Sequence, residues 1–183
     1  MAEHKHTIAI YAGTFDPLTM GHLSLIRRGK ELFDEVVVAV ADNTPKAQLF
    51  SHQERVAMAQ EAVAGMKGVV VEPFSGLLVH YAAQRGATAL LRGLRAVSDF
   101  EYEFQLALMN RRLDKEIQTV FLMTDYQWLY ISSTIVKAAA SHGGDVSGLV
   151  PTNVLKKLKA KYENGEVRQG TPCLAPSVGG FKI

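Results

Sequence analysis

The sequence has very little cysteine and no long hydrophobic segment. Cys173 is the only cysteine in 183 residues, which excludes an intramolecular disulfide and is typical of a reducing compartment. The longest strongly apolar run, from Val36 to Ala41, is much shorter than the roughly 20 residues that a transmembrane helix needs. Residues Met1 to His6 also lack the apolar core of a signal peptide. We therefore expect a cytoplasmic protein with no membrane partner.

The sequence also lacks a large excess of charge of either sign. The formal net charge is +2 at pH 7, from 20 Lys and Arg against 18 Asp and Glu. The one dense basic run, from Lys156 to Lys161, is expected to form the solvated face of a terminal helix rather than a nucleic-acid-binding patch. We therefore expect no nucleic acid partner.

Several common catalytic signatures are missing as well. The sequence has no G-x-x-x-x-G-K-[ST] phosphate loop, no G-x-G-x-x-G dinucleotide turn and no G-x-S-x-G nucleophile elbow. Paired cysteines and an H-E-x-x-H helix are also absent, which argues against a built-in zinc site, and we assign no residue as a metal ligand. The remaining candidates for chemistry are cations in loops and a histidine at the start of a helix.

Strand and helix patterns alternate through most of the chain. Apolar runs predict five strands, at residues 8–11, 35–41, 69–71, 88–91 and 119–122. The capping boxes Ser51–Glu54 and Ser98–Glu101 open two of the helices between them, and Ser132 or Ser133 can cap another that reaches Ser141. A last helix is expected to end at about Glu163. The helix at 98–113 has apolar residues on two faces, of which one can serve the core and the other a subunit interface.

This alternation predicts the fold class. Right-handed crossovers give an α/β fold with a Rossmann-like, doubly wound sheet of five parallel strands. We expect a single domain with C-terminal helices over residues 1–163, followed by a flexible tail over 164–183, which contains Gly, Pro and Ser and has little periodicity.

The stretch from Tyr11 to His22 joins the first strand to the first helix. Its glycines allow backbone to approach a ligand, and His22 falls in the first turn, where a helix offers free N–H groups and a partial positive charge. The junction therefore suits a phosphate group. Asp16, before Pro17, is expected to form a turn rather than act as an acid. Other candidate groups follow later strands, at 42–46, 92–95 and 126–134, where open parallel sheets bind ligands.

Two short patterns connect these junctions to a known family. Thr19 to His22 matches the [TH]-x-G-H pattern of the nucleotidyltransferase superfamily, and Ile131 to Thr134 resembles its second, serine-rich signature. With Gly13 to Pro17 and the longer block from Arg92 to Glu103, the chain resembles the bacterial phosphopantetheine adenylyltransferases over roughly residues 8–162. The short patterns are weak alone, whereas the long block is specific.

The resemblance implies an activity and its partners. Members of this family transfer the adenylyl group of ATP to 4′-phosphopantetheine by direct in-line attack, which gives dephospho-coenzyme A and pyrophosphate. The resemblance also implies Mg²⁺ as cofactor, a homohexamer, and coenzyme A as a feedback inhibitor. An anionic phosphate nucleophile needs no strong base, so alignment and charge neutralisation are the main demands on the site.

The resemblance also implies roles for individual residues. The implied catalytic residues are His22, Lys46 and Arg92. The implied ATP-binding residues are Thr14, Phe15, His22, Gly93, Leu94, Arg95, Glu103, Trp128, Leu129, Tyr130, Ile131, Ser132, Ser133 and Thr134. The implied residues for the second substrate are Thr14, Lys46, Leu78 and Arg92. Plainer interpretations are an exposed helix residue for Glu103, loop packing for Trp128 and a core position for Leu78.

Two other functions fit part of the sequence. One is a nucleotidyltransferase that acts on nicotinamide mononucleotide or on an alcohol phosphate, against which the block from Arg92 to Glu103 argues. The other is a non-catalytic ATP-binding sensor, which would have no use for Lys46 and Arg92 at a second phosphate. His52, His80 and His142 lie outside the motifs, so we expect structural roles for them.

Overall fold

The computed structural model describes residues 6–42, 47–95 and 97–163. Lys46, Cys173 and the expected tail at 164–183 lie outside these residues. The elements in chain order are β1 (Ile8–Gly13), α1 (Met20–Leu32), β2 (Glu35–Ala41), α2 (His52–Val63), β3 (Val69–Phe74), α3 (Leu78–Gln84), β4 (Ala89–Leu94), α4 (Val97–Leu113), β5 (Gln118–Met123), the short 3₁₀ helix η1 (Tyr126–Trp128), α5 (Ser133–Ser141) and α6 (Thr152–Glu163).

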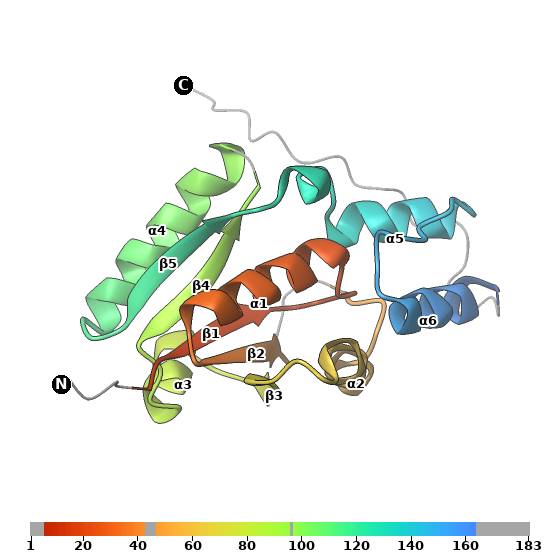
Figure 1. Ribbon diagram of the computed structural model, residues 1–183. Helices are drawn as coiled ribbons and strands as arrows, with labels where there is room; N and C mark the ends of the chain where they lie inside the picture. The colour runs from red at the N-terminus through yellow and green to blue at the C-terminus, as the bar shows by residue number, and fades with distance from the viewer. Residues whose placement is uncertain (1–5, 43–46, 96, 164–183) are drawn as a thin grey trace, which may run out of the picture.

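The five strands form one parallel sheet in the order β3-β2-β1-β4-β5. In Figure 1, helix α1 lies in front of the central strands and α4 lies behind β4 and β5. The predicted fold class, a doubly wound five-stranded parallel sheet with C-terminal helices, is confirmed.

Each face of the sheet has its own hydrophobic core. On one face, residues of β1, β2 and β4 pack against α1 and α2, with Leu25, Ile26 and Met58 among the buried helix residues. On the other face, alternate residues of the same strands pack against Val79 and Ala82 of α3. Strand β2 is completely buried from Val36 to Val40, as the continuous apolar run predicts for a central parallel strand.

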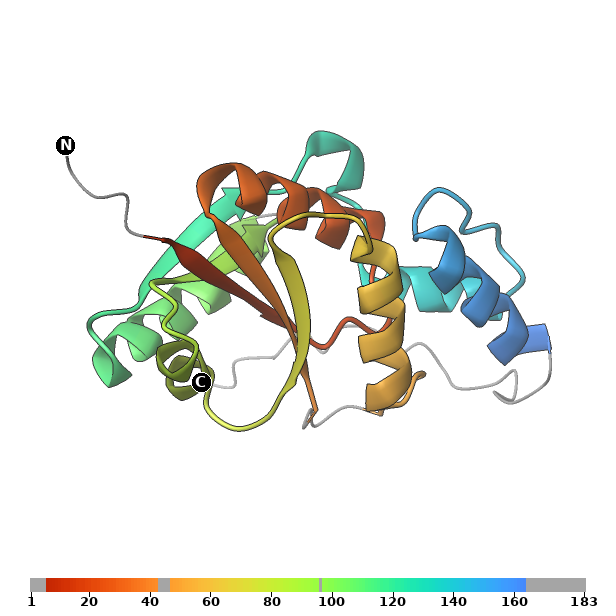
Figure 2. The same cartoon turned by 60° about the horizontal axis from the view of Figure 1, so that its bottom comes forward.

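The last two helices extend the first of these cores beyond the sheet. Figures 1 and 2 both show α5 and α6 side by side at the end of the molecule that carries α2. Val136 of α5 and Val154 and Leu158 of α6 are buried in the cluster that also holds the residues of α1 and α2. Over the described ranges of the chain, none of the helices has both the length and the apolar character that a membrane crossing requires.

Two expected boundaries are wrong near the fourth strand. β4 continues to Leu94, so Arg92, Gly93 and Leu94 belong to the strand and not to the loop after it. A charged residue remains in the strand here because the Arg92 guanidinium has partners at hand, described below. The next helix begins at Val97, which places Ser98 inside its first turn rather than at its cap.

The expectation that one face of α4 serves the core is also wrong when a single chain is considered by itself. Apolar residues from both predicted faces are exposed, each between 46% and 64%: Phe100, Tyr102, Phe104, Leu108, Met109 and Leu113. The physical reason is that α4 covers the border of the sheet, where β5 is itself only half-buried and has no strand on its outer side.

Candidate active site

The candidate site lies where the strand order of the sheet reverses, at the carboxyl ends of β1 and β4. The chain leaves β1 toward α1 on one face of the sheet and leaves β4 toward α4 on the other. Arg92 Nη1 bridges the two strands by donating to the carbonyl oxygen of Ala12, at 3.1 Å. Open parallel sheets bind their ligands at this kind of position, as the sequence predicts.

His22 is held at the start of α1 by a capping box. Thr19 is the N-cap, and the backbone N–H of His22 donates to its hydroxyl at 3.5 Å. In return, the backbone N–H of Thr19 donates to His22 Nδ1 at 2.9 Å. Because this N–H can only donate, Nδ1 is the acceptor, and the proton of a neutral ring is on Nε2. A capping box usually has Glu or Gln at this third helical position; here an imidazole takes the role.

The His22 ring is neutral at pH 7. Burial, and after it the positive charge of Arg95, lowers the pKa of His22 from its ordinary 6.5 to about 4. No described residue forms a hydrogen bond with Nε2, so its N–H is available to a ligand. The site therefore presents a neutral donor beside the free amides of a helix start, which suits a phosphoryl oxygen.

Aromatic rings support this histidine. Phe15 packs edge-on against His22, with 5.2 Å between ring centroids, and against Tyr11, at 5.4 Å. Phe15 is 3% exposed and has a φ of +48°, a left-handed conformation that is uncommon outside glycine. A Cβ at Gly13 would lie 3.0 Å from the Phe15 ring, so a side chain at this position would require the buried ring to shift. The predicted ATP contact Phe15 thus lies beneath His22, with its ring in the core.

Arg92 and Glu103 form a two-pronged ion pair. Arg92 Nε and Nη2 each donate to a different carboxylate oxygen of Glu103, both at 2.7 Å. The two side chains are 23% and 17% exposed, so solvent screens the pair only in part. Glu103 is therefore not the exposed helix residue of the plainer interpretation. Its role toward ATP stays a prediction, and what the structure adds is that Glu103 orients Arg92.

The residues after Arg92 connect the site to α1, α4 and α5. A Cβ at Gly93 would lie 2.3 Å from Cδ1 of the buried Leu25, so a side chain there would force this residue of α1 to move. Leu94 is buried, and its carbonyl accepts the N–H of Thr124 at 2.8 Å. Arg95 is exposed and pairs with Asp99 at 3.0 Å, while its Nη1 reaches the carbonyl of Ile131 at 3.5 Å.

The second signature forms the start of α5. Ser132 is the N-cap, and its hydroxyl accepts the N–H of Ile135 at 3.1 Å. Ser133 Oγ donates to the carbonyl of Pro17 at 2.8 Å, which places this helix start against the loop between β1 and α1. Thr134 is exposed. The structure therefore brings the two sequence signatures together, as expected from their likeness to the superfamily.

The residues before this signature differ in exposure. Trp128 is half-buried against the first core cluster, and its Cβ lies 3.5 Å from a Cβ built at Gly21. Ile131 is 4% exposed, whereas Leu129 and Tyr130 are 41% and 64% exposed. Trp128 and Ile131 thus pack against the protein, whereas the side chains of Leu129 and Tyr130 are accessible. The predicted contacts of these four residues to ATP stay predictions.

Sequence reasoning missed Arg55. This residue is 1% exposed in α2, and its guanidinium donates to the carbonyls of Thr14 at 2.6 Å, Ala41 at 2.8 Å and Phe50 at 3.3 Å. It thereby fixes the backbone of Thr14, a predicted contact to both substrates. The signal was present, because Arg55 occupies an inward position of α2 together with the buried Met58 and Ala59.

Leu78, expected to contact the second substrate, is the first residue of α3. It is half-buried against the second core cluster, beside Phe74 and Tyr81. Its position at the carboxyl end of β3 is compatible with both interpretations made from the sequence. Lys46 falls outside the described residues. The structural role expected for His52 stays a prediction; its Nε2 lies 3.1 Å from the carbonyl of Val40.

The described part of the chain contains no group of three or more His, Cys, Asp or Glu side chains placed to hold a metal ion. Two carboxylates at the site already have partners: Glu103 pairs with Arg92, and the buried Asp16 pairs with Lys137 and two backbone amides. Asp16 is therefore more than the turn former expected from its place before proline.

Comparison with known proteins agrees with this geometry. Residues 10–139 match the model of the cytidylyltransferase-like family. The chain is 68% identical over 162 residues to a phosphopantetheine adenylyltransferase of Nitratidesulfovibrio vulgaris (strain DP4), covering 88% of this chain and 87% of the relative. It is 70% identical over 155 residues to a protein of the same name from Oleidesulfovibrio alaskensis, covering 85% and 91%.

A solved structure resembles the fold at low sequence identity. It is a bifunctional NMN adenylyltransferase/ADP ribose pyrophosphatase of Francisella tularensis, complexed with AMP and a manganese ion. The TM-score is 0.62 at 15% identity, over 90% of this chain and 51% of the other. This similarity concerns the fold alone. The family match and the relatives at 68% and 70% identity show that the chain belongs to the phosphopantetheine adenylyltransferase family of cytidylyltransferase-like proteins.

Proposed function

We propose that this chain transfers the adenylyl group of ATP to 4′-phosphopantetheine, forming dephospho-coenzyme A and pyrophosphate, a step of coenzyme A biosynthesis. The acceptor follows from the names of the relatives, which cover most of the chain at 68% and 70% identity. The observation in the structure that carries the chemistry is the neutral His22 at a helix start, whose Nε2 has no described hydrogen-bond partner and which lies close enough to Arg95 to feel its charge.

The reaction needs alignment more than proton transfer. An oxygen of the acceptor phosphate attacks the α-phosphorus of ATP in line, and the bond from that phosphorus to the bridging oxygen breaks as pyrophosphate departs. The attacking oxygen is already anionic, so no general base is required. His22 donates from Nε2 to an α-phosphate oxygen and thereby stabilises the charge that grows in the transition state. A neutral donor does this without changing its protonation state.

Arg92, Lys46 and Thr14 would bind the acceptor phosphate. Glu103 and the carbonyl of Ala12 hold the Arg92 guanidinium, whose remaining N–H groups are available to the phosphate. Lys46 would approach the same phosphate from the loop that follows β2, and Leu78 would line the pantetheine arm.

The ATP side uses backbone amides and the start of α5. Gly93, Leu94 and Arg95 would lie against the nucleotide, with Trp128 to Ile131 around the adenine and Ser132 to Thr134 along the triphosphate. Support comes from the Ser133 hydroxyl, which already ties the start of α5 to the loop before α1. The two helix starts then direct their N–H groups toward one anionic ligand.

The required divalent cation would be Mg²⁺ bound to the triphosphate. Because the described residues contain no cluster of ligands for a metal ion, the donors would be phosphate oxygens and water. When bound, the cation offsets the negative charge of the departing pyrophosphate.

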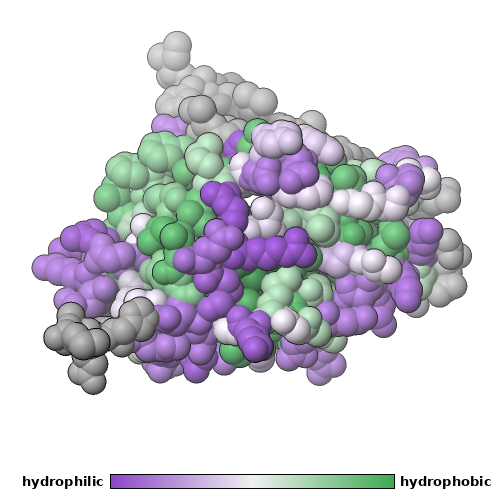
Figure 3. Space-filling model, viewed as in Figure 1, coloured by the Kyte–Doolittle hydropathy of each residue, from purple (hydrophilic) through white to green (hydrophobic). Residues whose placement is uncertain are grey.

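The exposed face of α4 supports assembly into a homohexamer. Figure 3 shows hydrophobic residues gathered over α4 and β5, and six large apolar side chains of α4 are between 46% and 64% exposed. Patches of this kind mark interfaces between subunits.

Coenzyme A carries both the pantetheine arm and the adenylyl group of the two substrates, so it would compete for the site as a feedback inhibitor. We place the protein in the cytoplasm, where both substrates occur.

The proposal is tested by measuring pyrophosphate release with one nucleotide and one acceptor at a time. ATP with 4′-phosphopantetheine should give turnover, whereas nicotinamide mononucleotide or glycerol phosphate as acceptor, and CTP as nucleotide, should give none. Turnover confined to one of those other pairs would overturn the proposal. Nucleotide binding without turnover for any pair would favour an ATP-binding sensor.

A further inference from the structure

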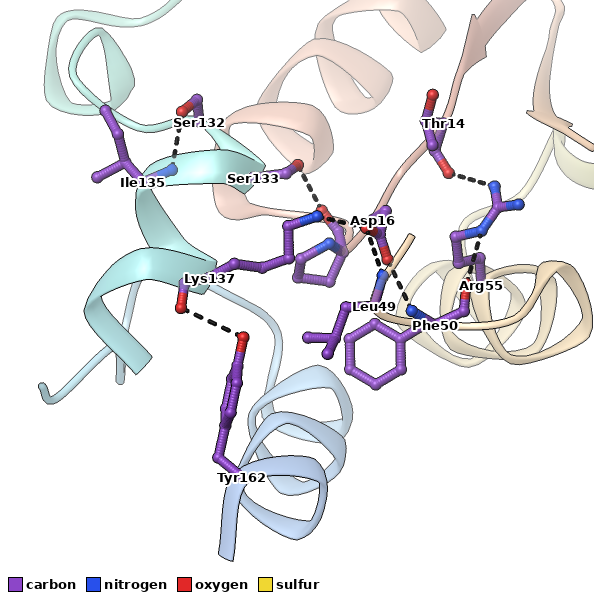
Figure 4. A network of polar contacts seen from close by, with 11 residues as sticks. Thr14, Asp16, Leu49, Phe50, Arg55, Ser132, Ser133, Ile135, Lys137 and Tyr162 are labelled. Carbon is purple, nitrogen blue, oxygen red and sulfur yellow. Dashed lines mark hydrogen bonds and ion pairs between the residues drawn. The ribbon is translucent and has the colours of Figure 1, made fainter. Parts of the chain in front are cut away.

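Asp16 is a buried carboxylate in the loop between β1 and α1, and it contacts two other parts of the chain. The residue is 4% exposed. Its Oδ2 accepts the N–H of Leu49 and its Oδ1 accepts the N–H of Phe50, both at 3.0 Å, and Lys137 of α5 donates to Oδ2. Figure 4 shows the carboxylate between these groups. No step of the proposed reaction uses it.

Two contacts, one helical turn apart on α5, hold this helix against the loop. Ser133 Oγ donates to the carbonyl of Pro17, and one turn further along α5 the Lys137 ammonium reaches Asp16. The carbonyl of Lys137 accepts the hydroxyl of Tyr162 at 3.3 Å, which adds α6 to the chain of contacts (Figure 4). Helix α5 lies past the end of the sheet, so these contacts determine the position of its first turn relative to α1.

The same loop is fastened to α2 by a second pair of contacts. Asp16 takes the amides of Leu49 and Phe50, and Arg55 donates to the carbonyls of Phe50 and Thr14. Asp16 is thus the one carboxylate among the described residues that joins the loop before α1, the start of α2 and the side of α5.

We propose that Asp16 and Lys137 are positioning residues, whose ion pair fixes the separation between the start of α1 at His22 and the start of α5 at Ser133. The inference rests on the proposed function, in which both helix starts hold one triphosphate. In-line transfer requires the reacting atoms to be aligned closely, so a displacement of one helix start weakens catalysis although no contact to substrate is removed.

The charge of Asp16 matters to this arrangement. Two backbone N–H groups and an ammonium are all donors, and a carboxylate offers only acceptors. An asparagine would turn an amide N–H₂ toward a donor and would lose the charge that attracts Lys137. Lys137 is 25% exposed, so it can be replaced with less damage to folding than the buried Asp16.

The decisive comparison uses Lys137→Met, Lys137→Arg and Lys161→Met, each assayed with ATP and 4′-phosphopantetheine. Lys161 is a matched control, because it is 24% exposed and pairs with Glu54 of α2, whereas the ion pair of Asp16 is with Lys137. We expect kcat/KM for ATP to fall about 10- to 100-fold in Lys137→Met, with KM for 4′-phosphopantetheine unchanged. Lys137→Arg, which can still reach the carboxylate, should retain activity, and Lys161→Met should match the wild type.

The outcomes separate the two proposals. All assays run at a temperature at which circular dichroism shows every variant folded. A wild-type protein without turnover would overturn the proposed function. An active wild type together with an unimpaired Lys137→Met, or a Lys137→Met protein whose KM for 4′-phosphopantetheine rises as much as its KM for ATP, would overturn the positioning role. Asp16→Asn and Lys137→Met should also be non-additive when combined, because they break the same contact, and additive losses would count against the inference.

Discussion

Replacing His22 by alanine should separate a catalytic loss from a structural one. The substitution removes the Nε2–H donor, and the loss of one such preorganised donor costs about 3 to 4 kcal/mol of transition-state stabilisation, or about 100- to 1000-fold in kcat. It also removes the Nδ1 acceptor of the Thr19 N–H and the ring packed on Phe15. These structural losses amount to about 1 to 2 kcal/mol, or about 2 to 8 °C in Tm.

The assay for this variant combines steady-state kinetics of pyrophosphate release with thermal unfolding. Thr19→Ala is the matched control, since it removes the hydroxyl of the cap and keeps the imidazole donor. It should lower Tm by a similar amount while kcat falls much less. A His22→Ala protein with wild-type kcat would refute the donor role, as would a Thr19→Ala protein with an equally large loss of kcat.

The pH dependence of stability gives an independent check of the His22 environment. Its pKa in the folded state is about 4, below the ordinary 6.5, so the unfolded chain binds a proton more readily at intermediate pH. The contribution of His22 to stability is therefore complete above about pH 6.5 and is lost as the pH falls toward 4. His22→Ala should lack this component, and an identical decline of Tm in both proteins would contradict the burial argument.

Two further substitutions test other parts of the site. Arg55→Met should lower the free energy of unfolding in urea by about 3 to 5 kcal/mol, because three backbone carbonyls lose a buried cationic donor, and a loss no larger than that of the exposed Arg27→Met would contradict this. Glu103→Gln should lower kcat/KM for 4′-phosphopantetheine by about tenfold, because Arg92 is no longer oriented by a charged partner. Its exposed neighbour offers the control Glu101→Gln, and equal effects of the two would remove the orienting role.

Local patterns were sufficient to predict the fold. The continuous apolar run of β2, the capping box at Ser51 and the cap at Ser132 are short-range signals, and the structure contains each of them. The predicted junctions at Thr19 to His22 and Ile131 to Thr134 also come together in space, because parallel strands bring their carboxyl ends to one edge.

The errors occur where distant residues decide the local structure. The apolar pattern predicts a strand that ends at Leu91, yet Arg92 continues β4 because Glu103 and the carbonyl of Ala12 satisfy its guanidinium. Arg55 was overlooked because its partners are backbone carbonyls, which leave no mark in the sequence. Asp16 was interpreted as a turn residue since neither Leu49 nor Lys137 can be anticipated as its neighbour.

The central position of β1 also affects how the chain folds while it is being synthesised. β1 pairs with β2 on one side and with β4 on the other, and the Arg92 to Ala12 contact across the second pairing joins residues 80 positions apart. A nascent chain therefore carries the complete motif from Thr19 to His22 long before its site exists. Until β4 emerges from the ribosome, one edge of a central apolar strand has no partner and is open to pairing with other chains.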